Sequence, residues 1–144
     1  AMPIEINEKC DAFEAPHTEK ASIDYMYFEK LFKDAQAKYH ISSEAMQKLN
    51  KMDEYNIEHF RISFGNRIVR QINDFVPVFV ACGGNEMQAL DYIIAHKILR
   101  KFDQLNSNLI KNELDDYIKF MEDLFGKDDI KECLYFLDRY KKSI

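Results

Sequence analysis

Apolar residues recur at intervals of three and four along most of the chain, from about residue 24 to residue 140. This spacing is typical of amphipathic helices, because residues three and four apart lie on the same helix face. The most regular stretch covers residues 85–105, with apolar positions at Met87, Leu90, Ile94, Ile98, Phe102 and Leu105. The pattern therefore predicts an all-α protein, a small helical bundle of five or six helices.

The first two predicted helices lie between residues 24 and 55. Residues 24–38 place five apolar side chains at helical spacing, and we expect this mainly aromatic face to lie in the core: Tyr25, Phe28, Leu31, Phe32 and Ala35. Ser42 and Ser43 supply the side chains that favour a helix start. The next apolar stripe continues to about Tyr55 and predicts a helix of about three turns.

A third helix begins near Gly65 and runs into the apolar stretch before Gly83 and Gly84. Pro77 lies inside it, so we expect either a kink or the end of one helix and the start of a short second one. The glycine pair is typical of a helix C-terminus. It could instead bind phosphate, but neither a flanking strand nor a G-x-x-x-x-G-K-[ST] pattern accompanies it.

The last third of the chain predicts two more helices. Residues 106–108 can cap a helix that ends at Gly126, and Asp128 or Asp129 can cap the final one. At the other end, residues 4–6 alternate after a proline and predict a short extended segment. We therefore divide the chain into an extended segment and loop, residues 1–22, and a helical domain, residues 23–144.

Charge and reactive side chains narrow the possible functions. The chain carries 20 basic and 25 acidic residues, a net charge of −5, which argues against a surface devoted to nucleic acid. Its three cysteines and four histidines are scattered without metal-ligand spacing, so we expect no metal site. No apolar run is long enough for a membrane span. We expect a reduced, cytoplasmic protein.

Three short motifs resemble the C-terminal part of McrB-like AAA+ NTPases, the motor subunits of modified-cytosine-dependent restriction systems. They are Phe64-Gly65-Asn66-Arg67, then Ala89-Leu90-Asp91, then Lys97-Ile98-Leu99-Arg100-Lys101. Family members carry F-G-Y-R at the start of a lid helix, followed by A-L-D and K-I-L-P-K in the same order and at similar spacing. The resemblance implies that the bundle is AAA+ lid-like and that residues 1–22 leave a missing core module.

Within this resemblance the F-G-x-R arginine is similar to the sensor-2 residue, which reaches from the lid to the phosphates of a nucleotide bound by the core. Here that residue is Arg67, and Arg70, one helical turn on, is the second candidate. Two positions depart from the family pattern. Asn66 replaces an aromatic residue, and Arg100 replaces a proline, so the long helix can continue through Phe102.

The parts of an NTPase that hold phosphates and magnesium are missing from these 144 residues, which contain neither a Walker A lysine nor a Walker B acidic pair. We therefore expect no catalytic residue, cofactor or NTPase activity in this chain alone. The resemblance implies that the parent protein binds GTP or ATP with Mg²⁺. It also implies several partners: the N-terminal NTPase core, neighbouring subunits of a homo-oligomeric ring, and a nuclease subunit and DNA in the full assembly.

Lys97, Arg100 and Lys101 gather on the polar side of the most regular helix and form a candidate patch for a ring neighbour or a polynucleotide. A solvated helix face is the simpler interpretation of these three residues. Two further functions stay open. One is a stand-alone helical interaction or regulatory module that binds a protein through an apolar groove. The other is a helical nucleic-acid-binding domain that uses Arg67 and Arg70, which the net charge of −5 disfavours.

Overall fold

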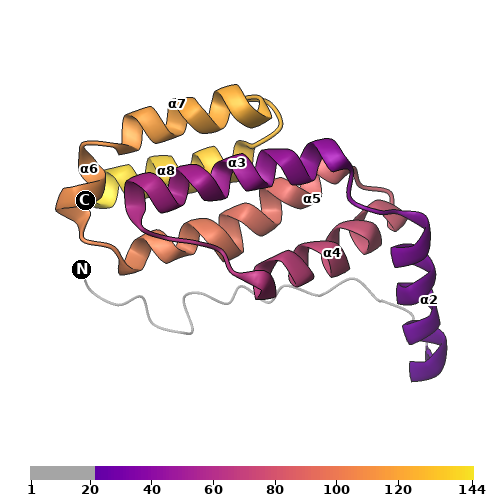
Figure 1. The fold of residues 1–144 in the computed structure, drawn as a ribbon. Coiled ribbons are helices and arrows are strands. Elements are labelled where there is room, and N and C mark those ends of the chain that lie inside the picture. Colours follow the sequence, from indigo (N-terminus) through magenta and orange to yellow (C-terminus); the bar gives the residue numbers. More distant parts are fainter. Residues whose placement is uncertain (1–21) are drawn as a thin grey trace, which may run out of the picture.

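A computed structural model describes residues 22–144, and this part of the chain is all-helical (Figure 1). It contains seven α-helices, a π-helical segment η1 and a 3-10 segment η2. Their bounds are α2 Tyr25–Lys38, α3 Ser43–Phe60, α4 Asn66–Ala81, α5 Glu86–Ile93, η1 Ile94–Ile98, η2 Leu99–Gln104, α6 Ser107–Lys111, α7 Leu114–Phe125 and α8 Lys131–Ser143. The prediction of an all-α protein is confirmed. The extended segment expected at residues 4–6 and most of the expected segment 1–22 lie outside the described residues.

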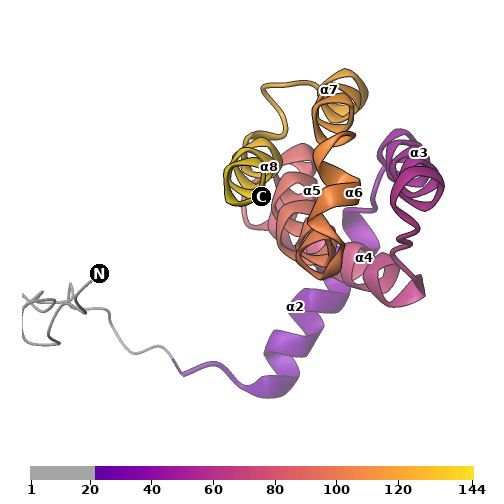
Figure 2. The same ribbon diagram turned by 90° about the vertical axis from the view of Figure 1, so that its left-hand side faces the viewer.

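The helices are arranged around one central rod, formed by α5, η1 and η2 in succession. Helix α4 packs on one side of this rod and α8 on another, while α7 contacts α3, α6 and α8. These long helices run roughly lengthwise, whereas α2 stands across one end of the bundle and contacts α4 (Figure 1). In the second view α2 leads away from the other helices (Figure 2).

The central rod begins with a capping box, in which the side chains and backbone N–H groups of Asn85 and Gln88 bind each other reciprocally. The prediction of one regular α-helix over residues 85–105 is wrong beyond Ile93. From there the backbone hydrogen bonding changes first to π-helical and then to 3-10 geometry. Even so, the chain stays helical as far as Gln104, as the replacement of proline by Arg100 suggested. Because neighbours surround the rod, it buries several faces rather than the single predicted stripe.

The N-terminus of helix α8 is capped by a residue that is distant in the sequence. Asp128 and Asp129, the caps expected from the sequence, form no side-chain cap; the N-cap position is Ile130. Instead Asp91 of α5, a buried residue, accepts hydrogen bonds from the backbone N–H groups of Glu132 and Cys133, each at 2.9 Å. A carboxylate at this place satisfies two N–H groups that have no partner within the helix and complements the helix dipole.

Helix α3 has 18 residues, about five turns rather than three. The apolar pattern was misread because buried Asn56 interrupts it, although Phe60, four residues later, is buried again. The helix ends at Arg61, which adopts a left-handed conformation with φ of 58°. This conformation is uncommon for a residue other than glycine, asparagine or aspartate.

Helix α4 continues through Pro77 as one helix. The expectation that one helix ends there and a second begins is therefore wrong. Its predicted C-terminus at the glycine pair is confirmed. Gly83 has φ of 96° and donates its N–H to the carbonyl of Val80, and Gly84 donates to Phe79. These two bonds form a Schellman motif, in which glycine relieves the strain of the positive φ.

The helix expected between residues 106 and 126 is two helices. Asn106 caps α6 through its side chain, and Gly126 follows the last residue of α7, as predicted. The chain turns at Asn112 and Glu113, however, and this turn allows both Ile110 before it and Leu114 after it to be buried. The split in this part of the chain is one reason why more than five or six helices are present.

Aromatic side chains from three elements meet in the core. The ring centroids of Phe60 in α3, Phe102 in η2 and Tyr117 in α7 lie 5.0 to 5.3 Å apart. Burial raises the pKa of the Tyr117 hydroxyl well above its usual value, and the neighbouring Asn56 amide offsets this only in part. Neither polar side chain has a hydrogen-bond partner of normal geometry, so this junction is held together by packing.

The aromatic face of α2 is the largest error of the sequence analysis. Only Ala35 of the predicted inward stripe is buried, and Tyr25, Phe28, Leu31 and Phe32 are exposed. The helix itself is as predicted, and its N-cap Asp24 accepts a bond from the N–H of Met26. Periodicity identified the apolar face of α2 correctly, but it cannot tell whether the same chain provides the surface that covers it.

We expect Asp91→Ala to lower the free energy of unfolding by about 3 kcal/mol, because two N–H groups at the start of α8 lose a charged acceptor in a buried place. Asp91→Asn should cost less. Asp128→Ala, which removes the cap that the sequence suggested, is the matched control and should change stability by less than about 0.5 kcal/mol. Urea unfolding followed by circular dichroism measures all three. Equal losses in Asp91→Ala and Asp128→Ala would contradict the assigned cap.

The cysteines of the described residues should differ sharply in reactivity. Cys82 is exposed, whereas Cys133 is buried beneath Asp91. Burial, followed by the charge of Asp91, raises the pKa of the Cys133 thiol well above its usual value. In a Cys10→Ser background, an aromatic disulfide reagent should modify Cys82 at least about a hundredfold faster than Cys133, whose reaction requires opening of the structure. Similar rates for both thiols would show that the packing of α8 on α5 is loose.

Candidate functional site

The start of α4 is an open helix N-terminus. Gly65 occupies the N-cap position in an extended conformation, provides no side-chain cap, and is followed by a first turn without an acidic residue. A Cβ atom placed on Gly65 would meet no atom within 4 Å. The first N–H groups of the helix therefore have no side-chain acceptor, and such a helix N-terminus favours an anion.

Arg67 and Arg70 extend from the first two turns of this helix, and both are exposed. Being three residues apart, they share one side of α4. No acidic side chain forms a salt bridge with either of them in the described range. The structure thus brings together the two arginines that the sequence proposed as phosphate sensors, next to the unpaired N–H groups of their own helix.

The connection that leads into α4 is held from two sides. Asp53 of α3 accepts a hydrogen bond from the N–H of Phe64 at 2.9 Å and one from the Ser63 hydroxyl at 3.2 Å. From the central rod, the Lys101 ammonium donates to the carbonyl of Ser63 at 2.8 Å. The Phe64 side chain is buried in the core. These bonds fix the direction in which Arg67 leaves the bundle.

Sequence reasoning missed the role of Asp53. A single acidic residue on an amphipathic helix gives no sign that it will bind a loop ten residues later, because the bond depends on where α3 ends. The left-handed Arg61 sets that end and turns the chain back toward Asp53. The one usable signal was the polar Ser63 directly before the buried Phe64.

The expected patch of Lys97, Arg100 and Lys101 is divided among three surroundings. Lys97 lines a groove between α2, α4 and α5, Arg100 lines a cleft between the central rod and α8, and Lys101 binds the loop before α4. The π and 3-10 hydrogen bonding of this segment helps to separate them, because it alters the angle between successive side chains. The three residues thus have different neighbours, and their role as a patch for a partner or a polynucleotide stays a prediction.

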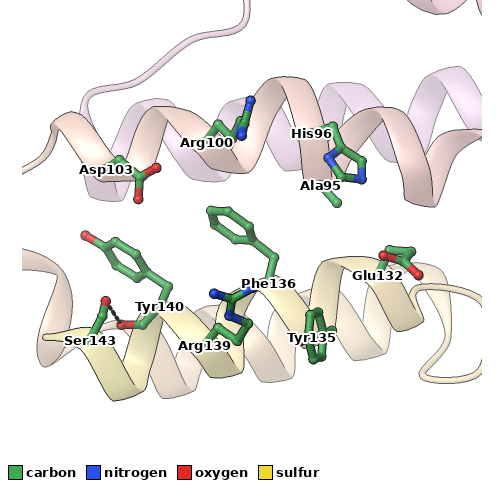
Figure 3. A pocket seen from close by; sticks show the side chains of 10 residues that line it. All are labelled: Ala95, His96, Arg100, Asp103, Glu132, Tyr135, Phe136, Arg139, Tyr140 and Ser143. Atoms are coloured by element: carbon green, nitrogen blue, oxygen red, sulfur yellow. Dashed lines mark hydrogen bonds between the residues drawn. The ribbon is translucent and has the colours of Figure 1, made fainter. Parts of the chain in front are cut away.

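The cleft at Arg100 has a volume of about 400 Å³ and lies between the rod and α8 (Figure 3). The rings of Phe136 and Tyr140 point from α8 toward the rod. Two arginines, Arg100 and Arg139, and two acidic residues, Asp103 and Glu132, line it. With equal numbers of cationic and acidic side chains, the cleft has little preference for an anion.

The polar contacts within this cleft join side chains to the backbone or to each other. The Tyr140 hydroxyl donates to the carbonyl of Phe102 at 3.0 Å, and its pKa is raised by burial and, to a smaller extent, by Asp103. The Arg139 guanidinium lies 5.7 Å from the centre of the Tyr135 ring, close enough for a cation–π contact. Among the residues that line the cleft, the side-chain hydrogen bonds run to backbone carbonyls, and none joins a nucleophile to a base.

Comparison with protein-family models gives one match, over residues 13–144, to a family described as "Domain of unknown function (DUF8727)". The match covers nearly the whole chain. The chain belongs to this family. Neither the comparison with curated proteins nor the one with solved structures found a match.

Two further findings concern the described part of this DUF8727 domain. Residues 22–144 bring together no group of three His, Cys, Asp or Glu side chains that could hold a metal ion. Among the same residues, no helix has the length and apolar character needed to cross a bilayer. The start of α4, with its uncapped N-terminus and its two exposed arginines, is the candidate site that the described residues define best.

We expect Asp53→Ala to loosen the start of α4. The substitution removes the acceptor of a partly buried N–H, so the free energy of unfolding should fall by about 1–2 kcal/mol. Amide hydrogen exchange should quicken most at residues 63–68, because local opening of this segment no longer has to break the hydrogen bonds of Ser63 and Phe64 to Asp53. The exposed neighbour Glu54 provides the control, and Glu54→Ala should leave exchange in this segment unchanged. Unaltered exchange in Asp53→Ala would mean that Asp53 does not hold the loop.

Proposed function

We propose that this domain is the C-terminal helical lid of an AAA+ NTPase and that Arg67 is its sensor-2 arginine. The observation that carries the proposal is the uncapped, exposed start of α4, where Arg67 and Arg70 lie beside unpaired N–H groups. The three McrB-like motifs of the sequence provide the family context. In the parent protein, a core module would bind the nucleotide and the lid would close over it.

The chemistry of this site suits a terminal phosphate group. A helix N-terminus offers backbone N–H groups and a partial positive charge, and phosphate is among the anions that such termini bind. Arginine adds a permanent charge and a planar set of donors that matches phosphate oxygens. Because Arg67 is exposed and has no acidic partner in residues 22–144, no salt bridge has to break before it binds.

The fold suits a lid that moves as a rigid body. Asp53 and Lys101 tie the start of α4 to α3 and to the central rod, and Asp91 ties that rod to α8. A force on Arg67 is therefore transmitted to the whole bundle rather than absorbed by a flexible loop. Nucleotide binding would draw the lid toward the core, and hydrolysis with phosphate release would free it.

The nucleotide, GTP or ATP with Mg²⁺, would be held mainly by the core. Arg67 and the first N–H groups of α4 are the groups of this chain that would contact its phosphates. Magnesium would be bound outside this domain, because the start of α4 presents no acidic side chain in its first turn. The same proposal includes ring neighbours, and a nuclease subunit and DNA as partners of the full assembly.

The test is hydrolysis by the parent protein with Arg67→Ala. Loss of one preorganised donor to developing phosphate charge should lower turnover by on the order of a hundredfold. Arg67→Lys should restore little activity, because a point charge replaces a planar donor set. Arg67→Ala in the isolated domain should leave the melting temperature nearly unchanged, since the side chain is exposed.

Arg70→Ala is the matched control, one turn further along the same exposed side. If only Arg70→Ala abolishes turnover, the sensor is Arg70 and the rest of the proposal stands. Wild-type turnover in both variants would show that this helix contacts no phosphate, and the lid function would be abandoned. A parent reading frame without an upstream G-x-x-x-x-G-K-[ST] motif would lead to the same conclusion.

A further inference from the structure

Helix α2 exposes more apolar side chain than any other element of the described chain. Tyr25, Phe28, Leu31 and Phe32 form one face at helical spacing, and all four are exposed. Tyr27 lies at the margin of this face and is also exposed. We call these five residues the α2 face.

The rest of the bundle supports only the C-terminal half of this helix. There Ala35 is buried and the Gln36 amide donates to Asp74 of α4 at 3.1 Å. The N-terminal half continues in the same direction past α4 and leads away from the bundle in both views (Figures 1 and 2). The same apolar face is thus covered along one half of the helix and left open along the other.

An apolar groove lies directly beside the α2 face. It has a volume of about 490 Å³ and is lined by Phe32 of α2, Phe75 and Val78 of α4, and Tyr92 of α5. Asp74 and Lys97 stand among its lining residues as the charged groups. The domain therefore carries a projecting apolar helix and an apolar groove next to each other.

The size of this surface calls for a partner. With aromatic side chains of about 150–250 Å² each, the α2 face exposes on the order of 500 Å², near the upper limit for a monomeric protein. With the groove walls added, the joint surface reaches about 600 Å² per partner, the size of a weak or transient specific interface. Its tyrosine and phenylalanine content is typical of interface cores.

The charges of α2 indicate which kind of partner its apolar face can bind. Residues 24–38 contain three acidic residues, Asp24, Glu29 and Asp34, and three basic ones, Lys30, Lys33 and Lys38, so the helix is neutral although the chain carries −5. A neutral apolar helix does not select a strongly charged partner, and it can meet an identical helix without repulsion. We propose that the α2 face and its groove form a two-fold interface with a second copy of this chain.

A two-fold arrangement uses both features at once. If two α2 helices pack antiparallel, the free half of each crosses the groove of the other copy, and each surface is covered by its counterpart. The interface closes after two copies and therefore differs from the head-to-tail contacts of a ring. The inference does not depend on the lid function, because it rests on α2 rather than on Arg67.

Sedimentation equilibrium of the full chain tests this pairing. Between about 1 µM and 1 mM, the weight-average mass should rise from 17.1 kDa, the mass of one chain, toward twice that value. The double variant Tyr25→Ser/Phe28→Ser should raise the dissociation constant at least about tenfold, because it removes two rings from the interface. Tyr92→Ser in the groove should weaken pairing as well.

Met26→Ser is the matched control. Met26 and Tyr25 are equally exposed, each at 75%, but Met26 points to the opposite side of the helix. Its substitution should change the dissociation constant by less than about twofold. Circular dichroism should show that all variants keep the helical fold.

Three results would overturn the proposal. The first is a mass that stays at 17.1 kDa over the whole concentration range. The second is equal weakening by Met26→Ser and by the double variant, which would show that the loss does not arise on the α2 face. The third is weakening by the double variant without any effect of Tyr92→Ser, which would exclude the crossing of helix and groove.

Discussion

The bond between Asp91 and the start of α8 is the contact on which the rest of the domain depends. It joins the central rod to the last helix across 41 residues of sequence, and it does so through a buried carboxylate and two backbone N–H groups. With α8 fixed, its Tyr140 can reach the carbonyl of Phe102 at the other end of the same pair of elements. Three hydrogen bonds, two near the start of α8 and one near its end, thus hold α8 along the rod, and the apolar core between them fixes its rotation.

The residues that carry the McrB-like resemblance divide into two groups by what they contact. Phe64, Asp91 and Lys101 make buried or long-range contacts within the domain. Arg67, Lys97 and Arg100 are exposed and without a salt-bridge partner in residues 22–144, and of these three Arg67 extends from the uncapped N-terminus of α4. The first group is needed for the bundle to hold its shape, whatever the protein does. Only the second is left for a ligand, and this is why the proposed function rests on Arg67.

Local signals in the sequence were sufficient for most helices and for the start of α4. The capping box at Asn85, the glycine pair after α4 and the cap at Asn106 each depend on residues that are close in sequence, and each is present in the structure. The errors arose where a distant residue decides the outcome. Asp91 replaces the local cap of α8, and buried Asn56 interrupts the apolar stripe of α3. The candidate arginines were predictable, whereas the loop contacts of Asp53 that position them were not.

The exposed face of α2 sets a limit on what a single chain can reveal. Its apolar periodicity is the same as that of the buried helices, and the same physical requirement, removal from water, would produce it on a face that another molecule covers. The difference lies in the surroundings: α4 reaches only as far as Ala35 and Gln36, and the helix continues beyond it. An interface helix must stay folded before its partner arrives, and α2 meets this requirement through its own cap at Asp24 and its anchored C-terminal half. The bundle therefore presents two separate candidate surfaces, a polar one at the start of α4 and an apolar one on α2. Helix α4 connects them, because it carries Arg67 near its N-terminus and supports the C-terminal half of α2.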